Sequence, residues 1–333
     1  MNVPSFCRHN RLIQNCAICS RERELELEAA VPHTSPRRAG AGSRAGGAGS
    51  ARARQAASGS RARGGVTVRR LNRGGDDGYH SPLLPGLRSS AEARRLASEM
   101  AFAAARLDTL ATAPPGLYAE VADRGTDIEE RTWLAFLIAY LCPTEDDDPF
   151  AGIRAVRTPW ASDELPDLSA VVTGPRGARD PAGSTRTLSA YRVWATRARS
   201  QSAGFSGEPG WSPERRFARA FERLALPGLH RDARLELLVS LGWTGTYDLR
   251  AGSLALGGAN EVTVAAKRAL GIGDPLLLDR RALELARACQ LPLEALDLAF
   301  YNWETRERAT MGMGPDAEVS AEVLARVSAT LGL

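Results

Sequence analysis

The sequence predicts a mainly α-helical domain between about residues 78 and 333, and three observations support this class. Apolar residues recur at three- and four-residue spacing through most of the region, as they do on the buried face of a helix. Alternation typical of a strand never extends beyond a few residues, although Thr246 to Leu256 is compatible with a small hairpin. Proline and glycine separate the helical stretches, as expected at helix ends.

The first helix is expected over 91–110, after the capping residues Ser89 and Ser90. A second begins at Asp127 and stops at Pro143, and because it is apolar nearly all round it should be central. Residues 158–187 are rich in Pro, Gly and Asp and predict a long loop. Further helices are expected over residues 187–205, 213–225, 231–241, 261–270, 276–289 and 294–307.

The chain before this domain divides into two parts. Residues 1–28 contain a Cys/His cluster followed by a short charged helix candidate. Residues 29–77 are built from Ala, Gly, Ser and Arg, with almost no large apolar side chain, and are interpreted as a disordered linker. Ten arginines and no acidic residue lie between residues 29 and 75, which favours a nonspecific DNA-holding arm over a merely solvated linker.

Composition also excludes some classes of protein. No apolar run approaches the roughly 18 residues that a membrane-spanning helix needs, and Cys, His and Arg occupy the place of a signal peptide's apolar stretch. A cytoplasmic protein without a membrane partner is therefore expected, and we expect it to be monomeric. Cys142 and Cys289 lie in apolar helical patterns and are predicted to be buried, reduced thiols.

Four potential zinc ligands lie within the first nineteen residues. Cys16 and Cys19 form a two-residue-spaced pair, and Cys7 with His9 can supply the other side of a tetrahedral Zn²⁺ site. A closed shell of three Cys and one His leaves no open position, so the metal would be structural. The alternatives are a redox pair or a chance cluster of surface thiols. The favoured prediction is a zinc knuckle.

A helix pair with a Pro-Gly turn is the most informative stretch of the chain. One helix ends at Leu226, Pro227-Gly228 turns the backbone, and an amphipathic helix begins after His230. Such a turn presents backbone N–H groups and a helix N-terminus that can hold a phosphate. We therefore expect Gly228, His230 and Arg231 to contact DNA.

This pair resembles the helix-hairpin-helix element of DNA glycosylases, although His230 stands where that element has a second glycine. Over a longer span the chain resembles the α-glutamyl/putrescinyl-thymine pyrophosphorylase family, which is related to these glycosylases and includes phage-defence enzymes that excise glucosylated hydroxymethylcytosine. The residues that carry the likeness are the zinc knuckle, Trp133 to Leu141, Ile153 to Trp160, the hairpin, and Glu261 to Arg281. The resemblance implies a helix-hairpin-helix glycosylase-like domain, double-stranded DNA with modified bases as the partner, and hydrolysis of an N-glycosidic bond.

The resemblance also indicates where the catalytic carboxylate would lie. In the glycosylases this Asp opens the helix after the hairpin, and Glu261 occupies that place here. Asp274, before the following helix, is the second candidate, and Asp248 is a third. Plain helix capping is the alternative role of each of these acids.

Other residues are candidates for DNA contact. Lys267, the only lysine of the chain, and Arg268 could reach phosphate, and Trp160 could stack on an unpaired base. Bifunctional glycosylases carry a lysine in the second hairpin helix, and Asp232 takes that position here. The resemblance therefore implies a monofunctional enzyme. A nucleotide-level pyrophosphorylase acting on modified thymidylate and a noncatalytic DNA-binding adaptor remain the alternative functions.

The zinc assignment makes a direct prediction. Purified protein should hold one equivalent of zinc, and replacement of both Cys16 and Cys19 by Ser should abolish the binding, because a tetrahedral site cannot close on two ligands. Elemental analysis of the two proteins measures the metal. A double variant that retains one equivalent of zinc would remove the assignment.

Overall fold

The helix ends follow local signals in the sequence. Asp127 caps the central helix, where its carboxylate accepts hydrogen bonds from the backbone N–H groups of Glu129 and Glu130. The same helix ends at Cys142, which has a positive φ of 59° and is followed by Pro143. Both ends agree with the prediction for this helix.

The computed structural model describes residues 75–162, 164–178, 183–314 and 319–333, which all belong to one compact unit spanning 69–333. This part of the chain is helical and the described residues contain no strand, so the mainly α class is confirmed. The helices are α2 (Ser90–Thr112), α3 (Leu117–Ala122), α4 (Ile128–Leu141), α5 (Ala151–Val156), α6 (Thr185–Arg197), α7 (Gln201–Ser206), α8 (Pro213–Arg223), α9 (Arg231–Trp243), α10 (Glu261–Leu270), α11 (Pro275–Ala288), α12 (Ala295–Thr305) and α13 (Ala321–Leu331). No helix among the described residues is both long and apolar enough to span a membrane.

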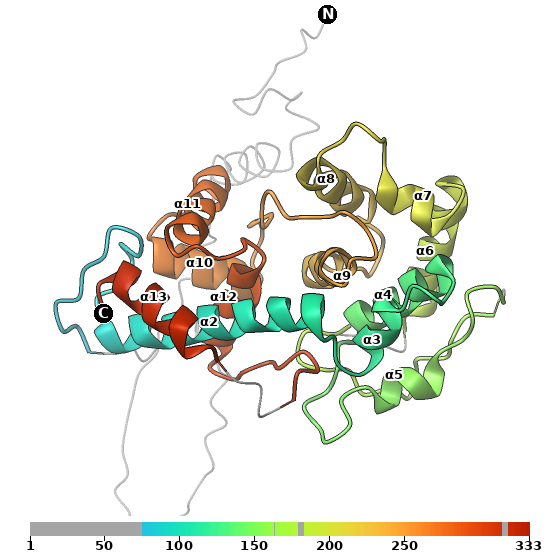
Figure 1. Ribbon diagram of the computed structural model, residues 1–333, viewed down its shortest axis with the longest axis horizontal. Helices are drawn as coiled ribbons and strands as arrows, with labels where there is room; N and C mark the ends of the chain where they lie inside the picture. The colour runs from blue at the N-terminus through green and yellow to red at the C-terminus, as the bar shows by residue number, and fades with distance from the viewer. Residues whose placement is uncertain (1–74, 163, 179–182, 315–318) are drawn as a thin grey trace, which may run out of the picture. The chain divides into compact units, whose positions relative to one another are not determined.

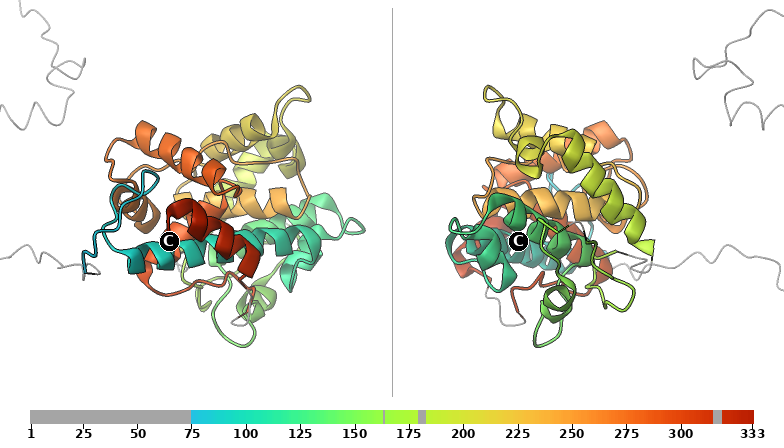
Figure 2. Two further views of the ribbon diagram at one scale, coloured as in Figure 1. Left: turned by 60° about the vertical axis from the view of Figure 1, so that its left-hand side comes forward. Right: turned by 90° about the vertical axis from the view of Figure 1, so that its right-hand side faces the viewer.

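Two groups of helices share the long helix α2. In one group α4 packs against α3, α5, α7 and α9, and every residue of α4 from Arg131 to Leu141 is buried. In the other group α10 packs against α11 and α12, while α12 and α13 lie along α2 (Figure 1). Figure 2 shows the C-terminal helix α13 beside α2 from a second direction. Since α2 also contacts α9, it joins the two groups.

Two predicted elements differ from the structure, and three helices were not predicted. The helix expected over 187–205 is two helices, α6 and α7, because Arg199 adopts a positive φ of 78° and Ser200 then caps α7. The small hairpin considered for Thr246 to Leu256 is wrong, because this segment is irregular. Short α3 and α5 lie outside the predicted helices, and so does α13. The zinc-ligand candidates lie outside the described residues, and so do residues 29–74 of the predicted linker.

The loop before α6 is held against the end of α4. The backbone N–H of Gly174 donates to the carbonyl oxygens of Leu141 and Cys142, each at 3.0 Å, and the N–H of Ala178 donates to Tyr140 at 2.8 Å. The approach is so close that a Cβ atom on Gly174 would lie 1.9 Å from the carbonyl oxygen of Pro143, and one on Gly177 would lie 2.1 Å from that of Leu141. Because these two glycines have no side chain, the loop can lie close to the end of α4, and Arg176 between them is buried.

We predict that Gly174→Ala destabilises the domain by about 1–3 kcal/mol, because a methyl group at this position overlaps backbone atoms that belong to a packed helix end. Urea unfolding followed by circular dichroism measures the difference. Gly210→Ala is the matched control, since a Cβ atom there meets nothing within 4 Å. Equal stability of the two variants would show that the loop is not held as described.

Candidate active site

A cavity of about 590 Å³ lies where the beginnings of α9 and α10 meet the loop before α6. Its wall is built from Tyr140 of α4, residues 175–178 of the loop, residues 230–233 of α9, the segment 257–261, and Tyr301 of α12. Five separate stretches of the sequence therefore contribute to one hollow. Its volume is within the usual range of small-molecule sites, roughly 300–1,000 Å³.

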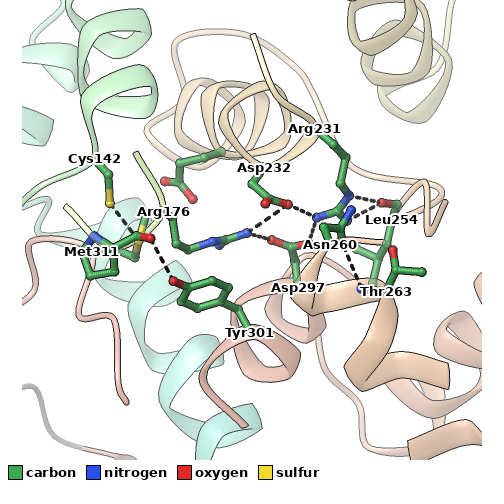
Figure 3. A network of polar contacts seen from close by, with 12 residues as sticks. Cys142, Arg176, Arg231, Asp232, Leu254, Asn260, Thr263, Asp297, Tyr301 and Met311 are labelled. Carbon is green, nitrogen blue, oxygen red and sulfur yellow. Dashed lines mark hydrogen bonds and ion pairs between the residues drawn. The ribbon is translucent and has the colours of Figure 1, made fainter. Parts of the chain in front are cut away.

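Four charged side chains form a network along this wall. Asp297 is only 2 % exposed and ion-pairs with both Arg176 and Arg231, the Arg176 contact being 2.5 Å long. Asp232 accepts a hydrogen bond from Arg231 at 2.8 Å and lies 3.8 Å from Arg176. Figure 3 shows the two arginines approaching the aspartates from opposite sides. Two cations and two anions thus balance within the network.

The network controls the protonation of its members. Burial alone would raise the pKa of Asp297, but the guanidinium groups of Arg231 and Arg176 outweigh burial and hold this pKa below its ordinary value. Burial would likewise lower the pKa of Arg176 and Arg231, whereas the neighbouring carboxylates raise both. All three groups therefore remain charged in the folded protein.

Tyr301 closes one side of the cavity and helps hold the loop. Its hydroxyl donates to the carbonyl oxygen of Pro175 at 2.9 Å, and the guanidinium of Arg176 lies 5.0 Å from the centre of its ring (Figure 3). Burial raises the pKa of Tyr301, and the charges of Glu261 and Asp232 add to this increase. Both carboxylates are therefore close enough to Tyr301 to act on it electrostatically.

Side chains also hold the irregular segment between α9 and α10. Asp279 accepts hydrogen bonds from the N–H groups of Leu254 and Leu256, and Arg231 donates to the carbonyl oxygen of Leu254. Asn260 then caps α10, with its side-chain oxygen accepting from the N–H of Thr263 at 2.8 Å. Glu261 is consequently the first residue of α10 and lines the cavity.

The structure separates the three catalytic candidates. Only Glu261 lines the cavity. Asp274 is exposed and caps α11, where it accepts from the N–H groups of Leu276 and Leu277. Asp248 is also exposed and ion-pairs with Arg216. Asp274 therefore takes the helix-capping role that was its alternative. Asp248 caps no helix and is a surface acid.

The DNA-contact candidates occupy different environments. His230 and Arg231 line the cavity, but the guanidinium of Arg231 is committed to the buried network. Arg268 ion-pairs with two carboxylates and lies 3.8 Å from the ring centre of Trp303. Lys267 is half-buried on α10 and lies outside the cavity lining. DNA contact by these residues stays a prediction.

The remaining two DNA-contact candidates belong to packed local structure. Gly228 has a φ of +76° in the exposed turn between α8 and α9, and a Cβ atom there would lie 2.2 Å from the hydroxyl of Thr187. Trp160 is partly buried, with its ring centre 5.4 Å from that of Trp133 and 4.0 Å from the guanidinium of Arg192. Stacking of Trp160 on a base stays a prediction.

Sequence reasoning missed several residues of the site. Arg176, Asp297, Tyr140 and Tyr301 were not expected there, and Asp232 was considered only as the position of an absent lysine. A charged residue in the apolar sequence of α12 was the available signal for Asp297, because an isolated acid in a buried helix needs a partner. Arg176 between two glycines was a weaker signal.

The chain was also compared with known proteins. None of the protein-family models, curated proteins or solved structures in the comparison matches it. Among the described residues, no group of three or more His, Cys, Asp or Glu side chains is arranged to hold a metal ion. The four zinc-ligand candidates Cys7, His9, Cys16 and Cys19 lie outside these residues, so zinc binding stays a prediction.

We predict that Asp297→Asn lowers the free energy of unfolding by about 3–5 kcal/mol at pH 7, because it leaves two buried cations with too little negative charge. Wild-type stability should also fall as the pH drops below about 3.9, the ordinary value for aspartate, toward the lower folded-state pKa. Stability falls with pH because the Asp297 carboxylate of the unfolded chain has the higher pKa and therefore binds a proton at a higher pH than that of the folded chain. The Asp297→Asn variant should lack the part of this pH dependence that comes from Asp297.

Urea titrations between pH 2.5 and 7 measure both effects. Asp248→Asn is the control, since its side chain is 66 % exposed in a surface ion pair and should change stability by less than about 1 kcal/mol. A variant at position 297 as stable as this control would contradict a structural role for the network.

Proposed function

We propose that the protein is a DNA glycosylase that excises a modified base by hydrolysis of the N-glycosidic bond. The observation that carries the proposal is the cavity between the start of α9 and the start of α10, which Glu261, His230 and Asp232 all line. A glycosylase needs a pocket for a flipped nucleotide and a carboxylate facing the sugar. The resemblance to the thymine pyrophosphorylase family and its phage-defence glycosylases supports the same reading.

The turn before α9 supports DNA binding next to the cavity. His230 precedes α9 without giving it a side-chain cap, so the N–H groups of the first turn are not bonded by that side chain. Within the described part of the chain, the structure gives no partner to the N–H groups of Gly228 and His230. Exposed N–H groups beside a helix N-terminus suit a phosphate. A DNA strand held here would lie next to the cavity, because His230 also lines it.

Glu261 is the carboxylate that we assign to the reacting sugar. Breaking the bond between the sugar and the base leaves positive charge on the sugar, which a nearby negative charge stabilises. A negative charge in the first turn of α10 interacts favourably with the helix dipole. An amide of the same shape provides no such charge.

The reaction itself is tested with duplex DNAs that carry different base modifications, including glucosylated hydroxymethylcytosine. Mass spectrometry should detect a released free base, and strand breaks should appear only after alkali, because a monofunctional enzyme leaves an abasic site. Consumption or release of pyrophosphate with free nucleotides would instead identify a nucleotide-level pyrophosphorylase. DNA binding with neither reaction would indicate an adaptor.

We predict that Glu261→Gln preserves the fold and DNA affinity but lowers the rate of base excision by at least about 10²-fold, the scale of a lost positioned acid, base or charge stabiliser. Single-turnover excision measures the rate. Asp274→Asn is the matched control, because Asp274 also lies at a helix start but outside the cavity. Loss of excision in the control with a near-normal Glu261→Gln would move the assignment to Asp274. If both variants are fully active, neither Glu261 nor Asp274 is the catalytic carboxylate, and the proposed correspondence of this region with the glycosylases is wrong.

A further inference from the structure

Asp232 belongs to the charged network and also lines the cavity. It lies in the first turn of α9, lines the cavity and has a side chain that is 18 % exposed. The ion pairs that hold it both use one oxygen, Oδ1, which is 2.8 Å from Arg231 and 3.8 Å from Arg176. Within the described part of the chain, the structure gives its other oxygen, Oδ2, no partner. One oxygen fixes the carboxylate, and the other is available to a bound molecule.

Asp297 explains how a carboxylate in this place keeps its orientation. It ion-pairs with the same two arginines from the buried side (Figure 3). These ion pairs hold both guanidinium groups in place beside Asp232. Arg231 is fixed further by its donation to the carbonyl oxygen of Leu254. A side chain held by packed, paired neighbours loses little freedom when it engages a substrate. The network is therefore suited to positioning Asp232.

We infer that Asp232 is a second catalytic carboxylate, which binds the attacking water through Oδ2 and accepts its proton. This inference rests on the proposed function. As the water oxygen bonds to the anomeric carbon, the carbon–nitrogen bond breaks and its electron pair leaves with the base. The base then takes a proton from solvent. Glu261, which also lines the cavity, stabilises the charge on the sugar. Two carboxylates with these roles are a common arrangement for the hydrolysis of glycosidic bonds.

Because the two carboxylates have different roles, their variants should respond differently to added azide. Azide is an anion that attacks carbon without losing a proton, so it needs no base. We expect Asp232→Ala to lower excision by at least about 10²-fold and sodium azide to restore much of the rate. The DNA product should then carry an azido group on the sugar, which mass spectrometry distinguishes from the hydroxyl product of water. Azide should not restore Glu261→Gln.

Folding and binding controls keep the test decisive. Thermal unfolding and DNA binding are measured for both variants, and Asp232→Ser, which keeps a hydrogen-bond acceptor for Arg231, replaces Asp232→Ala if the latter does not fold. An Asp232 variant with near wild-type excision, or a folded, DNA-binding variant whose lost activity azide does not restore, overturns this inference alone. A wild-type protein that releases no base from any of the modified DNAs overturns the proposed function, and this inference with it.

Discussion

Asp297 lies inside the domain between the guanidinium groups of Arg176 and Arg231, and the construction of the cavity depends on this contact. Arg176 comes from the loop before α6, Arg231 from α9 and Asp297 from α12, so one buried carboxylate ties three distant segments together. Removing such charges from water is costly, and only simultaneous pairing offsets the cost. The contact therefore favours one arrangement of these segments, and it places Asp232 and the loop wall around the same hollow.

The other walls are held by acids that accept hydrogen bonds from irregular backbone. Asp279 binds the N–H groups of Leu254 and Leu256, and Glu294 binds that of Ala251 at 2.8 Å. Buried N–H groups outside helices and strands need such acceptors. The segment before α10 is therefore fixed although it has no regular structure. Several acids of this domain therefore serve its interior.

Much of the helical framework could be predicted from sequence, because its signals are local. Asp127 and Pro143 mark the ends of α4, and Glu261 begins α10 as expected. The positive φ of Arg199 that divides α6 from α7 has no comparable signal, since arginine rarely adopts it. At the site, Glu261 and His230 could be proposed from position along the chain. Arg176 and Asp297 could not, because their pairing joins residues 121 apart in the sequence.

The composition of the cavity bears on the chemistry that we propose. A lyase reaction requires an amine nucleophile at the anomeric carbon, and the residues that line the cavity include no lysine in the part of the chain that the structure describes. Lys267 is six residues beyond Glu261, which is about 9 Å along the axis of α10. Asp232, which lines the cavity, is ion-paired with two arginines. A carboxylate at that place can direct water but cannot form a Schiff base, which agrees with the hydrolysis that we propose.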